Sequence, residues 1–109
     1  MFMDIEALKE KFRRGDYEIS LHAEKERYEE GISLNDIEAA IAHGELLEDY
    51  PDDPRGASCL MLGYADRQPL HVVCGYTSAQ SIRVITVYVP KPPKWVDART
   101  RRPQGEHYA

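Results

Sequence analysis

The feature that most constrains the fold is a change in hydrophobic spacing near residue 45. Before it, apolar side chains recur every three or four residues, as in Ile5, Leu8 and Phe12. After it, short apolar runs alternate with polar loops, which is typical of strands joined by hairpins. The chain therefore predicts an α+β domain, with N-terminal amphipathic helices packed on a short, mostly antiparallel four-stranded sheet.

Cap and stop residues place the predicted helices. Asp4, Ser20 and Ser33 are good N-caps, and a glycine follows each helical segment, at positions 15, 31 and 44. Tyr17 and Ile19 indicate only a short extended piece between the first two helices. The predicted strands span residues 45–50, 59–64, 70–76 and 82–89.

The length of 109 residues fits one domain, which we place at residues 1–96. Trp95 is expected to fold back as an apolar anchor, and residues 97–109 are predicted to be a mobile polar tail.

Odd-length hairpin loops would put Leu60, Leu62 and Tyr88 on the helix-covered sheet face. The other face would still be too apolar for full exposure, so it needs a covering segment or a partner. The remaining positions predicted for the helix-covered face are Leu70, Val72, Cys74 and Val84.

Charge is distributed unevenly along the chain, whose net charge is −5. Residues 16–53 carry thirteen acidic and two basic side chains, whereas residues 54–109 carry eight basic and three acidic ones. The distribution has two interpretations. Both halves can simply be solvated faces, or the basic half can meet phosphate while the acidic half does not.

Several classes of protein are disfavoured by missing patterns. No apolar run approaches the roughly 20 residues that cross a bilayer, and no signal peptide is evident, so a cytoplasmic location without membrane contact is expected. The sequence lacks a phosphate-binding glycine loop, a nucleophile elbow and a zinc-protease motif. No cofactor is expected.

Metal binding is also disfavoured. Cys59 and Cys74 are expected to be free buried thiols, although a two-residue hairpin loop would place them opposite each other and allow a disulfide. Zinc ligands at familiar spacing are absent. Asp49, Asp52 and Asp53 form no recognised cation loop, so no metal site is predicted.

The residue types needed to cleave RNA without a metal are present. That reaction needs a base, an acid and cations that stabilise the phosphate charge. His22 and His71 suit the proton transfers, and Arg83 and Tyr88 complete the candidate catalytic set. Arg27 and Arg55 are the candidate RNA-phosphate ligands.

Each candidate also has a structural interpretation. His22 can be a locally bonded first-turn histidine, and His71 a satisfied polar group in a half-buried strand. Arg83 can be a strand-edge charge that blunts aggregation, and Tyr88 can be a core residue. Arg55 can simply pair with its acidic neighbours.

Three segments carry a family resemblance: YEISLHAEKERYEEGIS, EDYPDDPRGASCLMLGYADRQPLHVVCGY and IRVITVYVPKPPKW. Over about residues 17–96 the chain resembles the family called domain of unknown function 4258, which is similar to the RelE-like toxin superfamily. The resemblance implies a helix-flanked sheet that cleaves mRNA, with His22 and His71 at matching positions. It also implies a cognate antitoxin partner, in some cases of zinc-finger type. The chain departs from the pattern HAxxRxxERG, because Glu26 and Glu30 stand where cations are usual and Arg27 is displaced by one.

Two main hypotheses follow. The first is an endoribonuclease toxin of a bacterial type II toxin–antitoxin pair. The second is a non-catalytic module of the same fold that binds a partner protein, or a second copy of itself, through the half-apolar sheet face. A small metal-dependent enzyme using Asp49, Asp52, Asp53 and a histidine is a distant third.

Overall fold

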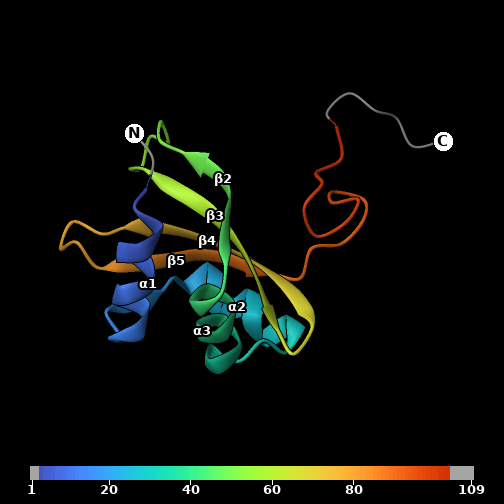
Figure 1. The fold of residues 1–109 in the computed structure, drawn as a ribbon, viewed down its shortest axis with the longest axis horizontal. Coiled ribbons are helices and arrows are strands. Elements are labelled where there is room, and N and C mark those ends of the chain that lie inside the picture. The colour runs from blue at the N-terminus through green and yellow to red at the C-terminus, as the bar shows by residue number, and fades with distance from the viewer. Residues whose placement is uncertain (1–2, 104–109) are drawn as a thin grey trace.

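Three helices pack against one face of a five-stranded sheet in the computed structural model, which describes residues 3–103 (Figure 1). This confirms the predicted α+β class. The helices lie below the strands in Figure 1, and the last described residues lie on the other side. The elements are α1 (Ile5–Arg13), β1 (Tyr17–Ile19), α2 (Leu21–Glu30), α3 (Leu34–Ala42), β2 (Glu45–Tyr50), β3 (Ser58–Ala65), β4 (Gln68–Tyr76) and β5 (Ile82–Tyr88).

The helix starts and the stop after α2 follow from local chemistry that the sequence shows. The Asp4 and Ser20 side chains accept backbone N–H bonds from Ala7 and Ala23, each at 3.0 Å. Ser33 forms a reciprocal capping box with Asp36 at the start of α3. After α2, Gly31 adopts the left-handed conformation that ends many helices.

The sheet has one strand more than predicted and is mixed: three of its four strand pairs are antiparallel, and one is parallel. Its order is β1-β5-β4-β3-β2, and β1 pairs parallel to β5. This added strand is the extended piece at Tyr17–Ile19, which is only three residues long. A piece this short has no alternating pattern of its own, so its pairing with a strand some 65 residues away could not be predicted.

Side chains of α2 and of its N-cap Ser20 satisfy the outer edge of β5 where β1 ends. The Ser20 hydroxyl donates to the Ile85 carbonyl at 3.0 Å. Carboxylate oxygens of Glu26 and Glu30 accept from the backbone N–H groups of Val87 and Val89. Glu26 and Glu30 therefore protect an exposed strand edge.

The β3–β4 hairpin differs from the predicted one, and the side chains of β3 therefore lie on the opposite faces from those predicted. Its loop is a two-residue turn, because Asp66 and Arg67 both have positive φ and Ala65 pairs with Gln68. Cys59 consequently lies opposite Cys74, and both are buried free thiols on the helix-covered face. Two of the residues predicted for that face, Leu60 and Leu62, are instead buried on the opposite face.

The predicted face of Tyr88 is also wrong, because the pairing of β4 with β5 contains a bulge. Cys74 pairs with Val84, but Val73 pairs with Thr86, so β5 holds an extra residue at Ile85. Beyond this bulge the alternation reverses, and Tyr88 lies opposite His71 on the second face. The helix-covered core is built from Cys59, Met61, Leu70, Val72, Cys74, Ile82, Val84 and Val87 together with helix residues that include Leu8, Phe12, Ala23, Ile37, Ala40 and Ile41.

Helix α3 approaches β3 so closely that only glycine fits at one point. A Cβ atom on Gly63 would lie 1.9 Å from the carbonyl oxygen of Ala40, far inside van der Waals contact. Gly44 meets the same oxygen, where a Cβ atom would lie at 2.5 Å. The backbones of helix and strand are therefore in direct contact.

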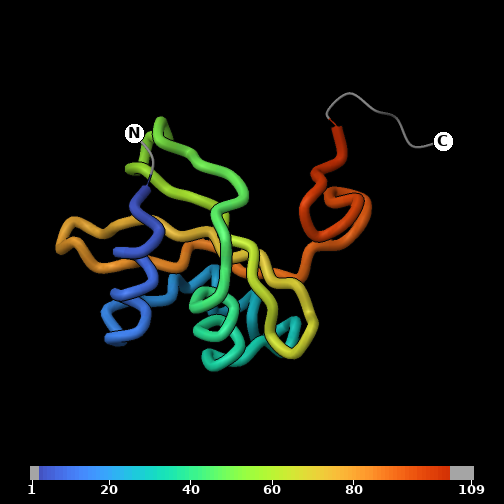
Figure 2. Tube along the Cα trace, in the orientation of Figure 1, coloured from blue at the N-terminus to red at the C-terminus, as the bar shows by residue number. Residues whose placement is uncertain are grey.

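Residues 91–103, here named the clasp, cover part of the second sheet face (Figure 2). Trp95 is 1% exposed, which confirms its predicted role as an anchor, and Leu60 and Leu62 are buried on this face. The domain boundary predicted at residue 96 falls inside the clasp, because Ala98 and Arg101 bond to residues of the sheet. Residues 104–109 of the predicted tail lie outside the described residues.

Candidate functional site

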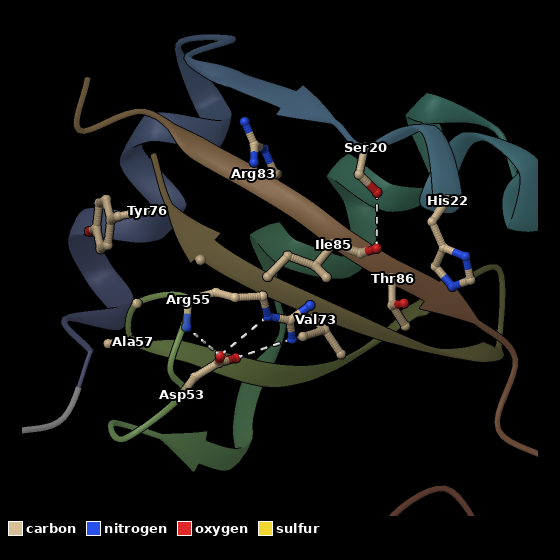
Figure 3. A pocket seen from close by; sticks show the side chains of 12 residues that line it. Ser20, His22, Asp53, Arg55, Ala57, Val73, Tyr76, Arg83, Ile85 and Thr86 are labelled. Atoms are coloured by element: carbon tan, nitrogen blue, oxygen red, sulfur yellow. Dashed lines mark hydrogen bonds and ion pairs between the residues drawn. The ribbon is translucent and has the colours of Figure 1, made fainter. Parts of the chain in front are cut away.

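An open groove of about 530 Å³ lies on the part of the second sheet face that the clasp leaves free (Figure 3). Its floor is formed by Val73, Ile85 and Thr86 of β4 and β5. The start of α2 forms one wall, and the loop between β2 and β3 forms another. Three of the predicted site residues line it: His22, Arg55 and Arg83.

His22 enters the groove from the first turn of α2, next to Thr86 (Figure 3). Its side chain is 67% exposed, and Nε2 lies 3.4 Å from a carboxylate oxygen of Glu26. The same carboxylate oxygen accepts from the Val87 N–H, so its position is fixed by the sheet. Glu26 therefore places a fixed carboxylate beside Nε2, and Nδ1 is the ring nitrogen that this carboxylate does not face.

Arg55 reaches over the groove floor from the β2–β3 loop (Figure 3). Its guanidinium pairs with both carboxylate oxygens of Asp53, at 3.3 and 3.4 Å, yet the side chain remains 77% exposed. The Arg55 backbone N–H and side chain, with the Ser58 hydroxyl, lower the pKa of Asp53. This loop holds Arg55 in place by a carboxylate, as the structural interpretation expected, and still presents it to the groove.

Arg83 lies on β5 at the opposite end of the groove from His22 (Figure 3). Its guanidinium is 3.4 Å from the Glu18 carboxylate on the neighbouring strand β1. Ser20 lies between these two ends, and its hydroxyl is already used in the bond to Ile85. Two arginines and one histidine from three separate segments thus surround one half-apolar floor.

His71 and Tyr88 lie next to the groove but are covered by the clasp. His71 is 0% exposed, with its ring edge-to-face against Trp95 at 4.3 Å between centroids. Nε2 lies 2.7 Å from the Ala98 carbonyl oxygen, which can only accept. Nε2 therefore carries the proton, and Nδ1 of the neutral ring accepts from the Tyr88 hydroxyl at 3.1 Å.

The environment of His71 favours its neutral form. Burial lowers the pKa of His71, against the smaller raising effects of the Ala98 carbonyl and the Glu48 carboxylate. Glu48 is itself bound by Arg101 of the clasp at 2.7 Å, which lowers the pKa of Glu48. In this arrangement His71 is a satisfied buried group that no substrate can touch, and its half-buried partner Tyr88 is bonded to it.

Arg27 does not contribute to the groove. Its guanidinium pairs with Glu24 at 2.6 Å and donates to the Ile32 carbonyl at 3.2 Å. It also stacks over the Tyr28 ring, 4.8 Å from the ring centroid. These contacts fix the C-terminal end of α2 and keep Arg27 away from the groove that His22, Arg55 and Arg83 line.

Within residues 3–103, no group of three or more histidine, cysteine or acidic side chains is arranged to hold a metal ion. Asp53 is occupied by Arg55 and Ser58, and it does not converge with Asp49 and Asp52 on a common centre. None of the described helices is long and apolar enough to span a membrane.

The sequence of residues 19–89 matches the model of a family described as "Domain of unknown function (DUF4258)". The chain belongs to this family. The DUF4258 region includes the groove and the His71–Tyr88 pair but ends before the clasp. No curated protein and no solved structure matches the chain.

Parts of this DUF4258 site were not predicted from the sequence. Glu18 pairs with Arg83 across two strands, and Thr86 joins the floor only because of the bulge in β5. Arg101 and Glu48, which fasten the clasp, are far apart in sequence and belong to no motif. The only available signal was Trp95, a lone tryptophan in a segment otherwise rich in proline and lysine.

Proposed function

We propose that this domain is an RNA endoribonuclease-like toxin related to the RelE-like superfamily, and that it holds an RNA phosphodiester in the groove. One observation carries the proposal: His22, Arg55 and Arg83 come from a helix, a loop and a strand to line the same open surface. Guanidinium groups match phosphate oxygens, and an exposed imidazole transfers protons near neutral pH. A half-apolar floor between them suits the ribose and base of a single-stranded RNA.

The chemistry needs no metal. The 2′-hydroxyl gives its proton to Nδ1 of His22 and bonds to phosphorus, while the bond from phosphorus to the 5′ oxygen breaks. That oxygen takes a proton from water, and the products are a 2′,3′-cyclic phosphate and a 5′-hydroxyl end. Arg55 and Arg83 stabilise the added negative charge on the phosphate.

RNA binding is expected to weaken when either groove arginine is removed. Because each cation replaces one counterion at the phosphate backbone, Arg55→Ala and Arg83→Ala should each lower the salt-dependence slope of binding by about 1. The measurement is fluorescence anisotropy of a labelled, mixed-sequence single-stranded RNA over a range of salt. Arg67→Ala is the matched control, because Arg67 is an exposed cation in the β3–β4 turn, outside the groove. If all three variants had the same salt-dependence slope, RNA would not bind in the groove.

Freeing a groove arginine from its carboxylate should strengthen RNA binding. Glu18 competes with phosphate for Arg83, and both side chains are about half exposed. Glu18→Gln removes this charge on an exposed position and is expected to tighten binding severalfold at low salt. The same anisotropy assay measures it, and unchanged or weaker binding would show that Arg83 does not meet phosphate.

A non-catalytic interaction module is the second candidate. Leu21 and Tyr28 of α2 are 90% and 75% exposed, and their spacing of seven residues puts them on the same side of the helix. Exposed apolar side chains of this size favour a protein partner, and the resemblance implies an antitoxin. Expression separates the candidates: a ribonuclease toxin arrests growth and purified protein cuts RNA, whereas an adaptor does neither.

A further inference from the structure

The clasp covers the continuation of the groove. His71 pairs with Tyr88 across β4 and β5, and the next pair on the same face is Val73 with Thr86, which forms the groove floor. Two residues along a strand span about 7 Å. His71 and Tyr88 therefore stand one pair beyond the floor, where the clasp packs on His71.

The clasp is built as a unit of its own. All backbone–backbone hydrogen bonds of residues 91–103 in the described chain stay within the segment, such as Val96 to Thr100 at 2.7 Å and Arg102 to Lys94 at 2.8 Å. The Asp97 carboxylate adds bonds to the N–H groups of Arg99 and Thr100. The clasp can therefore leave the sheet without breaking any strand pairing.

The contacts given between the clasp and the sheet centre on His71 and Glu48. The Trp95 ring packs on His71, and Arg101 stacks over that ring at 4.5 Å while it binds Glu48. The His71–Ala98 bond is the central polar contact. Exposed ion pairs at the two ends, Lys91–Glu30 and Arg99–Glu45, add little because water and salt screen them.

We propose that residues 91–103 are an autoinhibitory clasp, and that its release opens the groove onto His71 and Tyr88, with His71 as the second proton-transfer group. This inference rests on the proposed function. In the open form His22 takes the proton of the 2′-hydroxyl, phosphorus bonds to the 2′ oxygen, and the departing 5′ oxygen takes a proton from the His71 imidazolium. The clasp follows the matched family region, residues 19–89. The inhibition therefore comes from a segment outside that region.

Acid should release the clasp. The groups around His71 are Tyr88 of β5, Glu48 of β2 with its partner Tyr50, and Arg101 and Trp95 of the clasp. Burial makes the closed form bind a proton less well than the open form, so the closed form loses stability as the pH falls below about 6.5, the ordinary pKa of histidine. Glu48, whose pKa is lowered, stays ionised between pH 7 and pH 5, so the change in this range is that of His71.

Trp95 provides a direct readout, because it is the only tryptophan of the chain. On lowering the pH of the full chain from about 7 to about 5, its emission is expected to shift to the red and its quenching by acrylamide to rise, while the far-ultraviolet circular dichroism stays constant. His71→Gln, which does not titrate, should abolish the shift. His43→Gln, an exposed histidine at the end of α3, should retain it. A shift that occurs only together with loss of circular dichroism, or that persists in His71→Gln, overturns the proposal.

RNA cleavage separates this proposal from the proposed function. Arg101→Gln should expose Trp95 at neutral pH and cut a single-stranded RNA at least about tenfold faster than wild type, because an inhibited protein spends a tenth of its time or less in the open form. Cleavage at the wild-type rate by a variant with exposed Trp95 overturns the inhibition and leaves the proposed function standing. If acid exposes Trp95 but no variant cleaves RNA, the proposed function and the role of His71 in it are overturned. The clasp is then only a movable cover of the sheet.

Discussion

Gly63→Ala is expected to lower the free energy of unfolding by about 4 kcal/mol, a large part of the stability of a domain this size. The added Cβ atom would lie 1.9 Å from the Ala40 carbonyl oxygen and 2.7 Å from its Cα atom. These are backbone atoms in the middle of the contact between α3 and β3, so no side chain can turn away to make room. The helix must lift from the sheet, and Ile37 and Ile41 would lose packing with it. Urea denaturation followed by circular dichroism measures the loss.

Gly15→Ala is the matched control for this substitution. Gly15 follows α1 with φ at +73°, and nothing lies within 4 Å of a Cβ atom there. Its replacement by alanine tests backbone strain without a steric clash and should cost about 1 kcal/mol. If Gly15→Ala proved as damaging as Gly63→Ala, the close contact between α3 and β3 would not be the cause.

The sequence predicted those parts of the fold that depend on local chemistry. The caps Asp4, Ser20 and Ser33 all form as predicted, because each needs only a backbone N–H three residues along. The face assignment failed in β3, because it depended on the length of the β3–β4 loop, and at the end of β5, because of the bulge at Ile85. Asp66 and Arg67 form a two-residue turn without the Asn-Gly or Asp-Gly pair that usually signals one.

Half of the candidate residues lie together in the groove. His22, Arg55 and Arg83 do meet in one groove, as a shared phosphate site required. His71 and Tyr88 lie together outside the groove, and Trp95 packs on His71. The sequence indicated that Trp95 folds back, but its target depends on sheet register and on the bulge in β5, which no local pattern encodes.

His22→Ala should produce the largest loss of RNA cleavage, about 10²- to 10⁴-fold in kcat, which is the usual contribution of a general base. His22 is the one described histidine that lines the groove, so in the closed form no other imidazole can take the 2′-hydroxyl proton. KM should change little, since Arg55 and Arg83 still bind the phosphate. The measurement is steady-state cleavage of a labelled RNA, with binding checked separately by anisotropy.

Glu26→Gln tests how His22 is oriented rather than whether it is present. The glutamine side chain keeps an oxygen that can accept the Val87 N–H and so preserves the strand edge, but it removes the carboxylate that faces Nε2 of His22. A smaller loss in kcat than that of His22→Ala, with unchanged KM and unchanged melting temperature, would assign Glu26 a positioning role. His43→Ala, which removes a histidine outside the groove, should cut RNA at the wild-type rate. If His22→Ala and His43→Ala cut equally fast, His22 does not act as the base, and the groove is a binding surface without chemistry of its own.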